Sequence, residues 1–107
     1  MQIYNKLVRD KIPEIIKNNG ENPIVRILND SEFKSELENK LLEEYNEVIN
    51  SSGIDRIEEL ADMLEIIKFL AILEGKTLED VISVSNEKNI KRGSFIDKVY
   101  LEKVLKK

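Results

Sequence analysis

Apolar residues recur every three to four positions along most of this chain, which is the spacing of one face of an α-helix. The first such stretch is short: within residues 4–20, Pro13 suits the first turn of a helix and Gly20 suits its end. Residues 22–28 (NPIVRIL) are rich in β-branched side chains, so they predict a short strand. Residues 99–101 are compatible with another short strand or with a final turn of helix.

Two long helices are expected next. The first begins at a cap formed by Asp30 or Ser31 and runs to about Asn50. Its apolar ridge consists of Phe33, Leu37, Leu41 and Val48. The second begins at a capping-box pattern, Asp55 with Glu58, and continues to about residue 74. Its later part is apolar almost all round, which predicts burial on most sides and, in so short a chain, an oligomer core as much as an internal one.

A fourth helix should begin at Thr77, where Asp80 completes a second capping-box pattern, and end near Arg92, before Gly93. The chain therefore predicts a mostly α fold, an antiparallel helical bundle with at most a short two-stranded β element. Residues 1–107 should form a single domain, because no repeat, linker or low-complexity segment interrupts them.

Composition narrows the chemistry that this fold can perform. The 107 residues include no Cys and no His, which excludes thiol nucleophiles, disulfides, zinc sites built on these residues and imidazole acid–base catalysis. The groups that remain available for catalysis or binding are carboxylates, Lys, Arg, hydroxyl groups and a metal held by oxygen ligands. The N-terminus lacks the apolar core of a signal peptide and no apolar run is long enough to span a membrane, so we expect a cytoplasmic protein without a membrane partner.

Charge is unevenly distributed along the chain. The net charge of −4 argues against non-specific binding of nucleic acid polymers. Between Glu43 and Glu65 there are eight acidic residues and one basic residue, Arg56, whereas basic residues dominate from Lys88 onward. An acidic pole and a basic pole suit a metal ion together with an anionic ligand. For most individual charges, a solvated helix face is the simpler interpretation.

Several carboxylates border the apolar ridges of the two long helices. Glu44 continues the ridge of the first helix, and Glu47 follows it by one turn. In the second helix, Asp62 begins the ridge that continues through Ile66, Phe69 and Leu73, and Glu59 precedes Asp62 by one turn. An unpaired carboxylate beside a core is costly, and either a basic side chain or a divalent cation relieves that cost. Four carboxylates from two antiparallel helices would form the oxygen-only site that Mg²⁺ or Mn²⁺ prefers.

These residues resemble a known family. The runs EEYNE, Glu43 to Glu47, and ELAD, Glu59 to Asp62, look like the metal motif of the MazG-like all-α nucleoside triphosphate pyrophosphohydrolases, a superfamily that includes phosphoribosyl-ATP pyrophosphatase and dimeric dUTPases. The run NEKNIKR, residues 86–92, is similar to the N-x-K-x-x-x-R pattern that follows this motif in MazG-like proteins. The terminal runs YNKLVRDKIPEII and KRGSF…YLE look like the small branch of predicted house-cleaning pyrophosphatases.

The resemblance implies Mg²⁺-dependent hydrolysis, in which a nucleoside triphosphate yields a monophosphate and pyrophosphate. Its implied role is the house-cleaning of non-canonical nucleotides by a homodimer or homotetramer. The implied ligands of Mg²⁺, or of Mn²⁺ in its place, are Glu44, Glu47, Glu59 and Asp62. Glu43 or Glu47 would orient or deprotonate the attacking water. The implied substrate-binding residues are Asn86, Lys88 and Arg92, with Lys6 and Arg9 from the N-terminal segment.

Two other functions stay open on the sequence alone. One is a non-enzymatic helical oligomeric protein, with an interaction or regulatory role and an acidic metal-binding patch. The other is a divalent-metal module that has no substrate. For Lys6 and Arg9, a solvated lead-in to the first helix is as good an interpretation as a phosphate contact.

Overall fold

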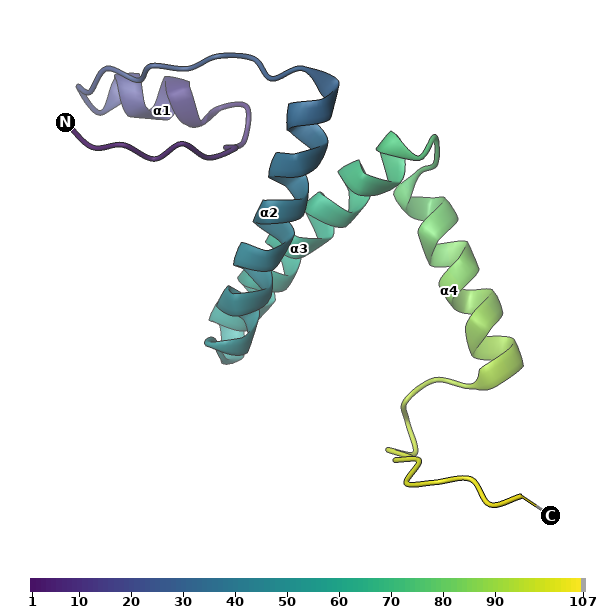
Figure 1. The fold of residues 1–107 in the computed structure, drawn as a ribbon. Coiled ribbons are helices and arrows are strands. Elements are labelled where there is room, and N and C mark those ends of the chain that lie inside the picture. Colours follow the sequence, from purple (N-terminus) through teal and green to yellow (C-terminus); the bar gives the residue numbers. More distant parts are fainter. Residues whose placement is uncertain (107) are drawn as a thin grey trace.

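The computed structural model describes residues 1–106, and these contain four helices and no strand (Figure 1). The helices are α1 Ile12–Asn18, α2 Asp30–Ile49, α3 Gly53–Leu73 and α4 Leu78–Arg92. The predicted mostly α fold is therefore confirmed. Helices α2 and α3 run antiparallel and pack along each other, while α4 contacts only the end of α3 among the helices.

The core lies between α2 and α3. Leu37 of α2 and Ile66 of α3 are the buried apolar side chains of the described residues. One end of the same seam holds an edge-to-face pair of aromatic rings, Phe33 and Phe69, with centroids 6.2 Å apart and planes at 79°. The predicted ridge of α2 therefore faces α3, and the core of the chain is the interface of one helical pair.

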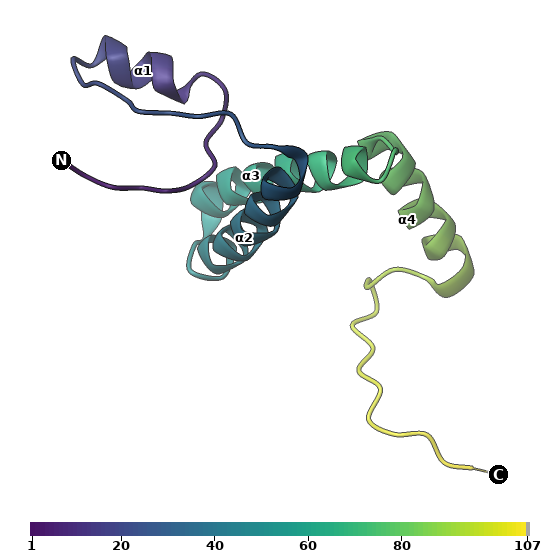
Figure 2. The ribbon, with the colours of Figure 1, turned by 45° about the horizontal axis from the view of Figure 1, so that its top comes forward.

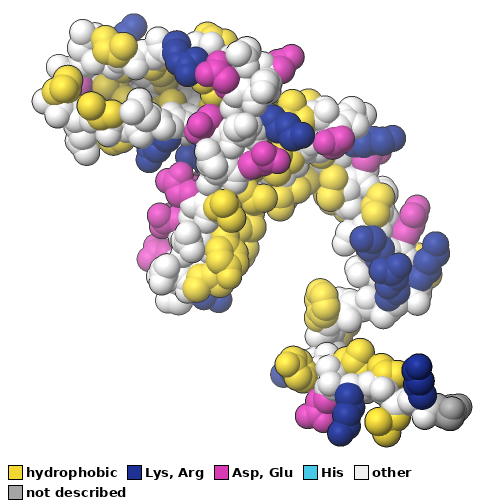
Figure 3. All heavy atoms as spheres, viewed as in Figure 1, with side chains coloured by type: hydrophobic (Ala, Val, Ile, Leu, Met, Phe, Trp, Pro, Cys, Tyr) yellow, Lys and Arg dark blue, Asp and Glu magenta, His cyan; other side chains and the backbone are white. Residues whose placement is uncertain are grey.

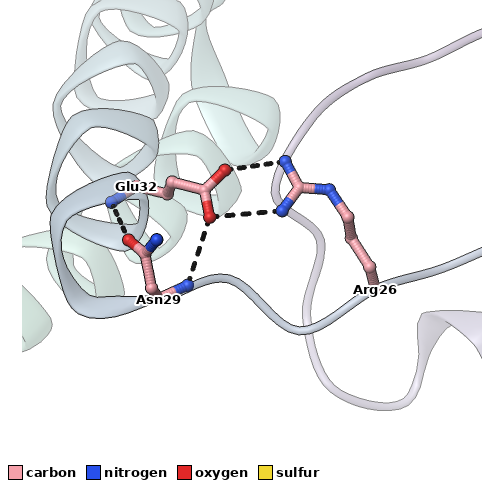
Figure 4. A network of polar contacts seen from close by, with 3 residues as sticks. All are labelled: Arg26, Asn29 and Glu32. Atoms are coloured by element: carbon pink, nitrogen blue, oxygen red, sulfur yellow. Dashed lines mark hydrogen bonds and ion pairs between the residues drawn. The ribbon is translucent and has the colours of Figure 1, made fainter.

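The start of α2 is fixed by a polar network (Figure 4). Asn29 is the N-cap: its side chain accepts a hydrogen bond from the Glu32 backbone at 2.9 Å, and the Glu32 carboxylate accepts one from the Asn29 backbone at 3.3 Å. Arg26 donates to both carboxylate oxygens of Glu32, at 3.2 and 2.8 Å. The predicted cap at Asp30 or Ser31 is therefore wrong by one or two residues, because Asn29 has an equally suitable side chain and also completes the box with Glu32.

The starts of α3 and α4 differ in their caps. Ser52 precedes α3 without a capping hydrogen bond from its side chain, so the capping box predicted at Asp55 is wrong. Gly53 has a positive φ of 60°, which lets the chain reverse direction and enter the helix at once. Asp55 then falls inside the first turn. At α4 the predicted box is confirmed, because Thr77 and Asp80 exchange hydrogen bonds of 3.1 and 2.8 Å.

The segment 22–28 has no regular secondary structure, so the strand predicted there is wrong. A strand exists only when its backbone pairs with a neighbour, and no backbone–backbone hydrogen bond involves residues 22–28. Its side chains Ile24, Val25 and Ile27 are exposed. Residues 99–101 form neither the strand nor the helical turn considered for them.

The overall shape is open. The Cα radius of gyration is 18.8 Å, compared with about 13 Å for a compact domain of this length. Residues 1–29, which include α1, form an N-terminal arm, and residues 93–106 form a C-terminal tail after α4. The arm and the tail extend to opposite sides of the α2–α3 pair, as a second view shows (Figure 2). No helix within residues 1–106 has the length and apolar character needed to cross a membrane.

Candidate metal centre

Three carboxylates converge where α2 packs against α3. Glu44 of α2 and Glu59 and Asp62 of α3 each offer an oxygen, and these oxygens lie within 4.8 Å of one another. Glu44 lies seven residues after Leu37, and Asp62 lies four residues before Ile66, so each carboxylate shares a helix face with a buried core residue. The packing that buries the apolar core therefore also assembles the carboxylate cluster, which consists of Glu44, Glu59 and Asp62.

Glu44 is the buried member of the cluster. Only 8% of the Glu44 surface is exposed, and its Oε2 has no hydrogen-bond partner. Burial, followed by hydrogen bonding with Glu59 and the negative charge of Asp62, together raise the pKa of the Glu44 carboxyl to about 7. A buried acceptor without a partner is unfavourable, so this oxygen is suited to receive a proton or a cation.

Basic side chains from the N-terminal arm approach the open edge of the cluster. Arg9 Nη2 donates to Asp62 Oδ1 at 2.9 Å. Lys6 Nζ lies 3.9 Å from Glu43 Oε1, and Lys40 Nζ of α2 lies 3.9 Å from Glu43 Oε2. A shallow hollow of about 210 Å³ lies beside Glu43, with both lysines in its lining. Positive charge therefore borders the carboxylates on the side of the N-terminal arm.

Lys40 was not among the residues predicted for the site. It is partly buried, with 21% of its side chain exposed, and it opposes the rise in the pKa of Glu44. A signal for it was present in the sequence, because it precedes Glu43 by three residues and Glu44 by four, which are the spacings of neighbours on a helix.

Two predicted carboxylates lie outside the cluster. Glu43 is exposed and contacts Lys6 and Lys40. Glu47 is also exposed, and it does not belong to the group of carboxylates whose oxygens lie within 4.8 Å of one another. It follows Glu44 by three residues, a rotation that carries its side chain off the face shared with α3. Of the four expected ligands, the structure thus brings together Glu44, Glu59 and Asp62.

The residues of α4 that the resemblance assigned to substrate binding are distant from the cluster in this chain. Asn86, Lys88 and Arg92 are exposed, and α4 points away from α2 (Figure 1). Asp62 lies eleven residues before the end of α3, a helix length of about 16 Å. Within residues 1–106, no ion pair joins Lys88 or Arg92 to any carboxylate.

Comparison with known proteins identifies a partial relative. A protein of Mycolicibacterium smegmatis, described as uncharacterized, is 46% identical to this chain over 43 residues, which make up 40% of this chain and 44% of that protein. The match therefore spans less than half of the relative's length. No protein-family model matches the chain, and no solved structure gives a significant match.

Proposed function

We propose that this protein is a Mg²⁺-dependent nucleoside triphosphate pyrophosphohydrolase that releases a nucleoside monophosphate and pyrophosphate, acting in the cytoplasm on non-canonical nucleotides. The observation that carries the proposal is the buried Glu44 carboxylate, which has an unpartnered oxygen and converges with Glu59 and Asp62. The reaction class comes from the resemblance of the EEYNE and ELAD runs to MazG-like enzymes.

The donor set fits a hard divalent cation. All three groups are carboxylates, and oxygen is the ligand that Mg²⁺ and Mn²⁺ prefer. Three carboxylates within 4.8 Å repel one another when all are ionised, and a divalent charge removes that repulsion. When bound, the ion supplies positive charge against phosphate oxygens and makes water more acidic.

Other residues of the chain have separable roles in this proposal. Glu43 lies next to Glu44 but outside the cluster, beside Lys6 and Lys40. In this proposal Glu43, or the exposed Glu47, orients the attacking water and accepts its proton. Lys6, Lys40 and Arg9 provide positive charge for phosphates at the edge of the cluster. The resemblance alone assigns substrate binding to Asn86, Lys88 and Arg92. For these residues to reach a bound substrate, α4 must take another position relative to the cluster or must belong to a second copy of the chain.

The direct test is an assay of the purified protein with Mg²⁺ and a panel of canonical and modified nucleoside triphosphates, in which pyrophosphate and monophosphate are both measured. Glu59→Gln and Asp62→Asn should each reduce turnover by at least about 100-fold, because each removes a charged oxygen from the cluster. Glu58→Gln is the matched control, because Glu58 is exposed on the same helix. Absence of release from every nucleotide, with Mg²⁺ or Mn²⁺, would reject the proposal.

Calorimetric titration with Mg²⁺ separates this function from its alternatives. Metal binding that requires Glu44, without turnover of any nucleotide, would favour a metal module. Neither metal binding nor turnover would favour a non-enzymatic interaction protein, and in that case Glu44→Gln should leave its binding to a partner unchanged.

A further inference from the structure

The hollow beside Glu43 lies between the N-terminal arm and α2, and its volume is about 210 Å³. Residues 5–7 line it from the arm, and α2 lines it with Glu36, Asn39, Lys40 and Glu43. These α2 residues follow one another at spacings of three and four, so they share one face of the helix. The hollow therefore follows α2 over two turns, a length of about 10 Å. Figure 3 shows acidic and basic side chains next to each other where the arm meets α2.

The two ends of the hollow differ in chemistry. At the Glu43 end, Lys6 Nζ and Lys40 Nζ each lie 3.9 Å from a Glu43 oxygen, and the next residue along the helix, Glu44, belongs to the carboxylate cluster. The opposite end contains Glu36, which is half-buried. The charged end of an elongated ligand would therefore lie at the cluster, and its other end would lie beside Glu36.

Polar groups of the hollow are available to a ligand. None of the side-chain hydrogen bonds within residues 1–106 involves Asn5, Glu36 or Asn39. No ion pair in this part of the chain includes Glu36. Each Asn amide offers both a donor and an acceptor, and the Glu36 carboxylate offers acceptors alone. The half-buried Leu7 adds an apolar contact to these groups.

We propose that this hollow is the nucleobase subsite of the proposed hydrolase, and that Glu36 and Asn39 select bases that carry an exocyclic amino group, such as adenine, cytosine and their modified forms. This inference rests on the proposed function. A carboxylate accepts a hydrogen bond from the amino group of cytosine, and an Asn amide pairs with the amino group and the adjacent ring nitrogen of adenine. Uracil and hypoxanthine present a carbonyl oxygen in place of the amino group, and this oxygen has no proton to donate to Glu36.

The size of the hollow agrees with this assignment. Pockets that enclose a whole drug-sized ligand have volumes of about 300–1,000 Å³, so a hollow of about 210 Å³ suits one part of a nucleotide. With the base beside Glu36, the phosphates lie toward Lys6 and Lys40, where positive charge is available to them.

The first test compares nucleotides that differ in this amino group, ATP with ITP and CTP with UTP. We expect kcat/KM to be higher for ATP and CTP by at least about 10-fold, the discrimination that one hydrogen-bonded base edge provides. Glu36→Gln should bring both ratios close to one, because an amide also donates to a carbonyl oxygen. Glu38→Gln is the matched control, since Glu38 is exposed on the same helix and does not line the hollow. Each ratio is measured on one preparation, so a partly unfolded variant does not distort it.

A binding measurement separates this inference from the proposed function. The α,β-methylene analogues of ATP and ITP carry carbon in place of the oxygen that the proposed reaction would release, so calorimetry with Mg²⁺ measures their binding without cleavage. The ATP analogue should bind at least about 10-fold more tightly. This result without hydrolysis of any triphosphate would refute the proposed function and keep the subsite.

Other outcomes would overturn the subsite. Hydrolysis with equal kcat/KM for the two members of each pair, or with a preference for ITP and UTP, would reject it and keep the proposed function. A preference for amino-bearing bases that survives Glu36→Gln combined with Asn39→Ala would place base recognition elsewhere on the chain. Absence of hydrolysis together with absence of binding by both analogues would reject the function and the subsite.

Discussion

The carboxyl group of Glu44 must leave water when α2 packs on α3, and this makes the stability of the metal-free protein depend on pH. Its pKa is 4.5 without this environment and about 7 within it, so between these values the folded state binds a proton that the unfolded state does not. The contribution of Glu44 to stability is therefore largest below pH 4.5, and this contribution is lost as the pH rises to about 7. The change corresponds to about 3 kcal/mol.

Urea denaturation in the presence of a chelator, at pH values from 5 to 8, measures this effect. Glu44→Gln should remove most of the decline and should stabilise the protein at pH 8, because the amide carries no charge to desolvate. Glu58→Gln, on the exposed side of α3, should retain the decline. A decline that survives Glu44→Gln would assign it to other groups.

The ion pair between Arg9 and Asp62 should affect metal binding more than it affects the stability of the fold. Its pair with Asp62 joins two side chains that are 57% and 43% exposed, and exposed pairs contribute about 0–1 kcal/mol. Arg9→Gln should therefore change the free energy of unfolding by less than about 1 kcal/mol. It should also strengthen Mg²⁺ binding, because a positive charge at the edge of the cluster repels the cation. Titration calorimetry of both proteins decides this, and weaker binding in the variant would contradict it.

At the scale of single elements, the start of α2 gives a sharp prediction. Asn29→Ala removes the acceptor for the Glu32 backbone and disturbs the carboxylate that Arg26 holds. It should cost about 1 kcal/mol in the free energy of unfolding, as loss of an N-cap does. Ser31→Ala is the control: Ser31 was an equally plausible cap by sequence, yet it lies inside the helix. Equal effects of the two substitutions on urea denaturation would refute the assignment of Asn29.

The elements also show what local sequence determines. The ridge through Leu37 predicted the buried face of α2 because helical periodicity repeats over five turns, and the same periodicity located Glu44, Glu59 and Asp62 beside the core. The strand at residues 22–28 was predicted wrongly because pairing depends on a partner that local composition does not specify.

The periodicity of the sequence also does not predict where α4 lies relative to the other helices. Its boundaries followed from Thr77 and Gly93, but its direction depends on a short connection and on few contacts with α3. The sequence pattern therefore grouped Lys88 and Arg92 with the acidic residues, while the fold of the single chain separates them. Sequence spacing predicts which residues share a helix face, and tertiary contacts decide which faces meet.

At the scale of the whole molecule, the carboxylate cluster joins the two helices that form the core, so occupation of the cluster should stabilise the fold. Unfolding separates Glu44 from Glu59 and Asp62, which lie on different helices, and the unfolded chain then has little affinity for a cation. Linkage gives a stabilisation of about 2.7 kcal/mol at a cation concentration 100 times the Kd. Removing Mg²⁺ with a chelator should lower the melting temperature, and the difference should grow with the Mg²⁺ concentration.

The size of this effect should depend on pH in a defined direction. A cation competes with the proton that Glu44 holds below about pH 7, so Mg²⁺ should stabilise the protein more at pH 8 than at pH 6. Thermal melts at both pH values, over a series of Mg²⁺ concentrations, measure it. Asp62→Asn should weaken the response and Glu58→Gln should preserve it, since Glu58 lies outside the cluster. A response of equal size in both variants would place the cation elsewhere on this acidic surface, and a larger response at pH 6 would contradict the role of Glu44 as a ligand.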